Sequence, residues 1–375
     1  MLDLQRRVGN SAVTQMLTRR QAATGRPSVV QRQTKTGSDL SLQFQQQLGG
    51  AAPDYSAAAL TLNGMSDTDM EAELRAITPA VQSLLFLGAL RTMLMWPPPH
   101  RVTDMIHRLN VTASRDGLIT YFRESVTYSH WHEAAVALNG LSDSDIATTI
   151  TTPPLSTAQL VQIRDAARQY MAGWNTRVVT PIAALLQGAT AAELASMVGS
   201  RATWIGSGPR SGNTFESWAS APTQGTTPPV QPSTRINCWE MVLLAAFRAG
   251  TINWQWIHDA YTVSGVGDWS TFLANRLTPG GRQTYLRGSP AGPTPRRGDI
   301  VLWNGISHVG MAVGGRDGAG RTQVYSFWPP PGTAFVRGGT EDAVKITTIE
   351  ELADYMDAHG MSGGVTLVEF GPGPW

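Results

Sequence analysis

The stretch Arg235-Ile236-Asn237-Cys238-Trp239-Glu240 marks the point where a polar, proline-rich segment stops and an apolar helical pattern begins. Cys238 is the only cysteine in the chain. Asn237 is a favourable N-cap, which places Cys238 in the first turn of a helix that Gly250 is suited to end. A thiol in that position faces unpaired backbone N–H groups and the positive end of the helix dipole, so we expect its pKa to be lowered.

Composition limits the classes of protein that this chain can belong to. The length of 375 residues predicts two or three domains, and a hydrophobic content of 42% is sufficient for their cores. A net charge of +1 gives no reason to expect nucleic acid as a partner. One cysteine excludes an intramolecular disulfide. The N-terminus carries no signal-peptide pattern, and the most apolar stretch, 80–96, is too short and too polar for a membrane span. We therefore expect synthesis in the bacterial cytoplasm without a signal peptide.

Changes in composition along the chain predict an α+β protein with four regions. Residues 1–39 are basic and polar, which favours a disordered tail. Residues 40–200 have the pattern of an all-α domain. Residues 201–235 are rich in Pro, Gly and Ser, which predicts a linker without regular elements. Residues 236–375 alternate between helical and strand patterns and form the α+β domain.

The all-α region contains an internal repeat, because the pattern of residues 59–69 returns at 135–145. In each copy an apolar helix ends at Asn-Gly, where the glycine, Gly64 or Gly140, is suited to a left-handed cap. A serine, Ser66 or Ser142, then begins the next helix, with an aspartate three residues later. Each repeat is therefore expected to be a helix, a tight turn and a second helix.

Two histidines in the same region, His130 and His132, resemble a metal site at first sight. No cysteine and no further ligand at helical spacing accompanies them, so we interpret them as helix-surface residues and expect no metal or other cofactor. The region is typical of a scaffold, an adaptor or a binding module.

After Cys238 the sequence predicts a helix over 238–249 and another over about 253–263. Strands are expected at 299–303, 308–313 and 322–328, the last two joined as a hairpin, with a closing strand at 365–370. A capping box at Thr347 and Glu350 opens one more helix through Met356.

His308 begins the second of these strands and is the natural partner for Cys238. Strand alternation places His308, Gly310 and Ala312 on one face, where small residues let the cysteine helix pack closely. We expect the imidazole to act on a thiol that approaches over this face.

The hairpin register selects the neighbours of His308. A symmetric hairpin pairs Gly314 with Thr322, so His308 lies opposite Trp328 and diagonal to Ser326. A polar Ser326 would orient the imidazole, and an indole beside it would keep water away from that hydrogen bond.

Three motifs together resemble the NlpC-type and CHAP-type branch of papain-like cysteine hydrolases. They are Asn237-Cys238-Trp239, the Gly-Asp-Ile-Val-Leu-Trp run at 298–303 and the Ser-His-Val-Gly-Met-Ala-Val-Gly run at 307–314. The resemblance implies a papain-like domain whose antiparallel sheet packs on the cysteine-bearing helix. Ser326 occupies the place where the family has His, Asn, Gln or Glu, and Trp239-Glu240 stands where cell-wall enzymes have Ser-Gly.

This resemblance implies a hydrolase that cleaves amide bonds (peptide, isopeptide or glutamine-type) through a thioester on Cys238. His308 and Ser326 complete the catalytic group, and Asn237, Trp239 and Trp328 line the oxyanion and substrate site. His258 is a rival base, and Gln231 is a rival oxyanion donor. A deamidase or acyltransferase acting on a target-cell protein, a peptidoglycan amidase or endopeptidase, and a non-enzymatic binding protein remain open alternatives. We expect a monomer with a protein or peptide substrate.

The basic tail resembles N-terminal segments of actinobacterial proteins linked to extracellular contractile injection systems. The matching residues are Leu4, Gln5, Arg6, Gly9, Asn10, Ala12, Val13 and Leu17, followed by Val30-Gln31-Arg32-Gln33. The resemblance implies a toxin or effector that is loaded into an injection particle and delivered to a target cell.

Overall fold

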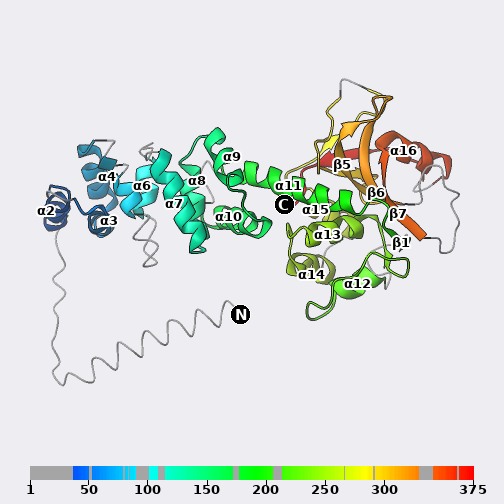
Figure 1. Ribbon diagram of the computed structural model, residues 1–375, viewed down its shortest axis with the longest axis horizontal. Coiled ribbons are helices and arrows are strands. Elements are labelled where there is room, and N and C mark those ends of the chain that lie inside the picture. Colours follow the sequence, from blue (N-terminus) through cyan, green and yellow to red (C-terminus); the bar gives the residue numbers. More distant parts are fainter. Residues whose placement is uncertain are drawn as a thin grey trace, which may run out of the picture.

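The computed structural model is an α+β fold in which a row of helices leads into one mixed eight-stranded sheet (Figure 1). It describes residues 37–49, 53–78, 81–82, 84–89, 101–108, 115–171, 177–205, 213–265, 267–289, 292–328, 341–360 and 363–375. The basic tail expected at 1–39 lies outside these ranges, except that residues 37–39 begin the first described helix.

The helices before the sheet run from blue to green in Figure 1. They are α2 (Gly37–Leu48), α3 (Tyr55–Asn63), α4 (Asp67–Ala76), α6 (Arg101–Arg108), α7 (Arg115–Thr127), α8 (Trp131–Asn139), α9 (Asp143–Thr151), α10 (Thr157–Tyr170) and α11 (Val179–Ser196). The expected repeat is present as the pairs α3–α4 and α8–α9, which end and begin where the sequence predicts.

The caps of the repeat differ from the prediction at the glycines. Ser66 and Ser142 do accept the backbone N–H groups of the aspartates three residues later, as expected. Gly64 and Gly140, however, have φ angles of −80° and −78°. The prediction that these glycines adopt a left-handed conformation is therefore wrong. Each glycine instead continues the right-handed turn, and its N–H still reaches carbonyl oxygens of the preceding helix.

The sheet contains strands that lie far apart in the sequence. They are β1 (Arg201–Trp204), β2 (Arg235–Ile236), β3 (Gln283–Thr284), β4 (Ile300–Trp303), β5 (His308–Arg316), β6 (Thr322–Phe327), β7 (Glu341–Thr348) and β8 (Val368–Gly371). Their order is β2-β1-β7-β6-β5-β4-β8-β3. β1 and β2 pair in parallel while the other pairs are antiparallel, so the expected antiparallel sheet is a mixed one.

The segment 201–235, expected as a linker without regular elements, contributes to this sheet. It holds β1, the short helix α12 (Thr214–Ala219) and β2. Ala202, Phe215 and Trp218 are buried, and this apolar burial outweighs the turn-forming composition around them.

The helices of the C-terminal region are α13 (Cys238–Arg248), α14 (Trp254–Thr262), α15 (Trp269–Leu277) and α16 (Ile349–Ala358). α13 begins after Asn237 and ends before Gly250, which has a φ angle of +71°, as the sequence predicts. The last capping box lies one residue later than expected, between Thr348 and Glu351. α15, β3 and β7 were not expected.

α11 belongs to the same packed core as the sheet, because it contacts both α13 and β5. The Thr190 hydroxyl lies 2.8 Å from that of Thr251. The Gln187 side-chain amide donates to the Arg297 carbonyl and to the Asp299 carboxylate, at 2.8 Å each. The helical region therefore continues into the α+β region without a break in packing at residue 200.

The two faces of the sheet are covered by different helices. Val309 and Met311 of β5 share a core with α13. His308 lies on the other face between the rings of Trp303 and Trp328, and this face packs on α16. The expectation that the cysteine helix packs over the His308 face is therefore wrong, because the larger side chains of the alternate residues supply the apolar contact that α13 needs.

Candidate functional site

Cys238 is held at the start of α13 by a reciprocal capping box. The Asn237 side-chain oxygen accepts the Glu240 N–H, and the Glu240 carboxylate accepts the Asn237 N–H, both at 3.0 Å. This arrangement satisfies two backbone donors at the helix start and fixes the backbone on both sides of the cysteine.

The Cys238 thiol lies in a dry environment, since the residue is only 2% exposed. Burial raises its pKa to about 12, although the sulfur accepts backbone N–H groups of Val309 and Trp239, which act in the opposite direction. The nearby Glu240 carboxylate raises the pKa further. The expected lowering by the helix N-terminus is therefore reversed, because loss of water disfavours the thiolate more than the helix end favours it.

His308 is completely buried, and Ser326 holds one of its ring nitrogens. Nε2 lies 2.8 Å from the Ser326 hydroxyl. The imidazole makes edge contact with Trp328 at 4.8 Å between ring centroids, and it lies 5.2 Å from Trp303. Burial lowers the pKa of His308 to about 3. Nδ1 is buried and has no hydrogen-bond partner among the described residues.

The strand register near His308 agrees with the sequence prediction. Met311 pairs with Tyr325 and Ala312 with Val324, and continuing this register places Trp328 opposite His308. Nearer the turn the prediction is wrong, since Thr322 pairs with Arg316 and not with Gly314. A β-bulge between Ala312 and Arg316 takes up the two extra residues without disturbing the His308 end.

Strand β5 carries one group that contacts the thiol and also carries the imidazole. The backbone N–H of Val309 donates to the Cys238 sulfur. His308 is the residue immediately before Val309 in the chain. The structure records no hydrogen bond between the sulfur and the imidazole itself. Burial keeps both groups neutral, and Nδ1 is the His308 ring nitrogen without a partner among the described residues.

The other predicted site residues divide into two groups. Asn237 belongs to the site, and its side-chain Nδ2 is buried without a partner among the described residues. Trp239 instead packs within the helices, where its indole N–H lies 3.4 Å from the Tyr261 hydroxyl. The rival candidates are used elsewhere: His258 Nδ1 lies 3.0 Å from the Ala219 carbonyl, and Gln231 donates to Ser233.

Sequence reasoning missed the role of Glu240. The carboxylate is 1% exposed and accepts both an amide N–H pair from Asn213 and the hydroxyl of Tyr261, at 2.7–3.0 Å. Burial raises the pKa of Glu240 to about 7 despite these donors. The Asn-x-x-Glu spacing from Asn237 to Glu240 is a capping-box signal that identifies this carboxylate in the sequence.

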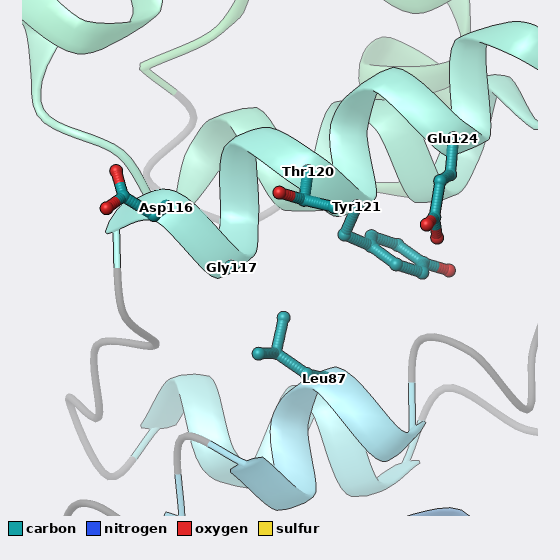
Figure 2. Close-up of a pocket in the computed structure, with 6 residues that line it drawn as sticks. All are labelled: Leu87, Asp116, Gly117, Thr120, Tyr121 and Glu124. Atoms are coloured by element: carbon teal, nitrogen blue, oxygen red, sulfur yellow. The ribbon is translucent and has the colours of Figure 1, made fainter.

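A separate cavity of about 300 Å³ lies in the helical region beside α7, which Figure 1 shows well away from α13. Figure 2 shows Leu87 on one helix facing α7 across it. The residues that line it are Leu87, Asp116, Gly117, Thr120, Tyr121 and Glu124. This cavity carries none of the groups predicted to do chemistry.

Two further features are absent from the described part of the chain. No group of three or more His, Cys, Asp or Glu residues is arranged there to hold a metal ion. No helix in those ranges is both long enough and apolar enough to cross a bilayer.

Comparison with known proteins finds no match to a protein-family model, to a curated protein or to a solved structure.

Proposed function

We propose that the C-terminal region is a thiol-dependent acyl hydrolase with a papain-like arrangement of Cys238, His308 and Ser326. The observation that carries the proposal is the division of roles on the imidazole. Ser326 holds Nε2 and Nδ1 stays unpaired, while the backbone N–H of Val309, the residue after His308, donates to the Cys238 sulfur. Nucleophilic catalysis by a cysteine needs an oriented base with a free nitrogen, and His308 supplies one on the strand whose next residue contacts the sulfur.

In the resting site both groups are neutral, because burial raises the thiol pKa and lowers the imidazole pKa. The reaction therefore begins with proton transfer and not with a preformed ion pair. With Nε2–H donating to Ser326, Nδ1 presents its lone pair and takes the thiol proton as the sulfur attacks the carbonyl carbon. The protonated Nδ1 then delivers that proton to the leaving amine, and a thioester remains on Cys238.

Hydrolysis completes the cycle. Water attacks the thioester carbonyl while Nδ1 takes one of its protons, and the sulfur leaves and recovers that proton. The carboxylic acid is released, and both groups return to the neutral state. An amine or alcohol in place of water would give acyl transfer, and ammonia as the leaving group would make the reaction a deamidation.

The supporting features follow the chain order of the family that the sequence resembles. The cysteine begins a helix, the histidine begins a strand, and the polar residue lies on the next strand with a tryptophan two residues later. We propose a target-cell protein or peptide as the substrate. Delivery by an injection particle has its support in residues 4–33, which lie outside the described ranges.

The test is acyl transfer to the full-length chain from p-nitrophenyl acetate, with peptide mass spectrometry to locate the acetyl group. We expect acetylation of Cys238 in the wild type and release of nitrophenol in repeated turnovers. Cys238→Ala, His308→Ala and the double variant should all lose about the same large factor, because the two residues act as a unit. Ser326→Ala should lose only about tenfold, since it orients the base without touching the acyl group.

Two outcomes would contradict the proposal. One is a wild-type Cys238 that stays unmodified while the same cysteine is acetylated in denaturant. The other is His308→Ala reacting as fast as the wild type. Either result would support a binding protein in which the buried thiol and imidazole serve only packing.

A further inference from the structure

Unpaired polar atoms collect at the end of the sheet where Cys238 lies. Among the described residues, one buried side-chain polar atom in each of Trp204, Asn237, His308 and Trp328 lacks a hydrogen-bond partner. An unpaired buried polar group costs about 1–3 kcal/mol. These four unpaired groups lie at one end of a fold whose other buried polar groups are mostly paired. We therefore expect a molecule outside the chain to supply their hydrogen-bond partners.

These four residues are neighbours in space, although they come from four different elements. Trp204 of β1 pairs with Ile236, the residue before Asn237. The Trp204 and Trp328 rings meet edge to face at 4.6 Å, and Trp328 in turn meets His308 at 4.8 Å. The set therefore joins the imidazole, through the two indoles, to the strand that leads into Asn237 and Cys238.

Asn237 presents its free donor in a fixed direction. Its side-chain oxygen is held by the Glu240 N–H at 3.0 Å, so turning the amide over would break the helix cap. Nδ2 is consequently committed as a donor one residue before the nucleophile, and the residue is 1% exposed.

The free groups share one chemical property. Besides His308, which the proposed reaction uses as base, they are an amide N–H₂ and two indole N–H groups, all of which donate and none of which accepts. All three donors are neutral, which suits neutral carbonyl oxygens better than a buried carboxylate. The site is therefore complementary to an acyl group that carries two carbonyl oxygens.

We propose that this donor-only cluster binds a peptidyl acyl group, with the scissile carbonyl oxygen on Asn237 Nδ2 and the preceding carbonyl on the indole N–H groups of Trp204 and Trp328. This inference rests on the proposed function. It selects peptide and isopeptide bonds over the glutamine side-chain amide, because a glutamine side chain has no second carbonyl at the corresponding distance from its amide.

The first experiment tests Asn237 with Asn237→Ser, which keeps an N-cap oxygen but removes the amide N–H₂, because the shorter hydroxyl does not reach the position of Nδ2. Acylation of Cys238 by p-nitrophenyl acetate should slow by about 10²-fold, the usual loss for one oxyanion donor. Disulfide exchange of Cys238 with methyl methanethiosulfonate should stay unchanged, because that reaction forms no oxyanion. Equal acylation rates in wild type and variant would overturn the assignment.

The second experiment tests the indoles with two esters of equal length, p-nitrophenyl levulinate and p-nitrophenyl valerate. Only levulinate has a second carbonyl, at the position of the preceding carbonyl in a peptide. The wild type should prefer levulinate by about tenfold, the effect of a net hydrogen bond. Trp204→Phe should abolish this preference.

Trp303→Phe is the matched control for the indoles. Trp303 also touches the His308 ring, but its indole N–H is already bonded to the Ile349 carbonyl at 3.4 Å. This variant should keep the levulinate preference whatever its absolute rate. A wild type that is acylated through Cys238 yet shows no preference would refute the inference alone, whereas no acylation of Cys238 at all would refute the proposed function.

Discussion

At the scale of single residues, burial decides the protonation of the candidate site. The thiol and the imidazole are both removed from water, so each favours its neutral form. The helix N-terminus alone predicts the opposite for Cys238. A fully buried position overrides the few tenths to one kcal/mol that a helix end contributes.

The buried imidazole should make the protein sensitive to acid. Its folded pKa of about 3 lies below the usual value of 6.5, so the unfolded chain binds the proton more readily. The stabilising contribution is therefore full above pH 6.5 and is lost as pH falls toward 3. We expect the wild type to lose about 3 kcal/mol relative to His308→Asn between pH 7 and pH 4.5, measured by urea unfolding at each pH.

Comparing the two proteins cancels other titrating groups, including Glu240, whose raised pKa gives a slope of opposite sign. If the two proteins lost stability in parallel over this range, the imidazole would not be buried in its neutral form.

At the scale of elements, one carboxylate connects three helices. Glu240 of α13 accepts hydrogen bonds from Asn213, the N-cap of α12, and from Tyr261 of α14. The same carboxylate caps α13 through Asn237. The position of the cysteine thus depends on helices that the sequence pattern does not connect with it.

We expect Glu240→Ala to lower the free energy of unfolding by about 3 kcal/mol, since it leaves buried donors on Asn213, Tyr261 and Asn237 without an acceptor. Because the folded pKa of about 7 exceeds the ordinary 4.5, the stabilising contribution is largest below pH 4.5 and is lost as pH rises through 7. The destabilisation should therefore be larger at pH 5 than at pH 8. Denaturant titration at both pH values measures it.

Glu193→Ala, a change at a partly exposed carboxylate on α11, serves as the control and should cost less than about 0.5 kcal/mol. Similar losses for the two variants would mean that the carboxylate of Glu240 does not connect the helices.

At the scale of the whole molecule, α11 ties the row of helices to the sheet. Ile182, Leu186, Ala191 and Leu194 of α11 are buried in the core that also contains α13 and the α13-facing side of β5. The sequence boundary at residue 200 separates two composition types but cuts through this core.

Two fragments test this arrangement. Residues 177–375 keep α11, whereas residues 200–375 expose the surface that α11 covers. Burial of four apolar side chains is worth about 5 kcal/mol, so we expect the shorter fragment to unfold at a clearly lower temperature or to aggregate. Circular dichroism melting of both fragments measures the difference. Equal melting temperatures would restore the boundary at 200 as a true domain boundary.

The features that the sequence by itself determined depend on local interactions. The Asn237 cap, the limits of α13, the helix pairs at Ser66 and Ser142, and the strands at His308 and Thr322 follow from residues a few positions apart. The register that places Ser326 beside His308 also agrees with the prediction, although the predicted pairing at the turn is wrong, because the β-bulge between Ala312 and Arg316 takes up the difference.

Only the tertiary structure decided which partners and which face each element meets. β7 lies between β6 and β1, and β1 pairs in parallel with β2, across distances in sequence that no periodic pattern encodes. The covering of the His308 face by α16 and not by α13 depends on the packing of side chains from separate elements. The burial that keeps Cys238 and His308 neutral follows from that packing, because the loss of water around a residue is a property of everything folded over it.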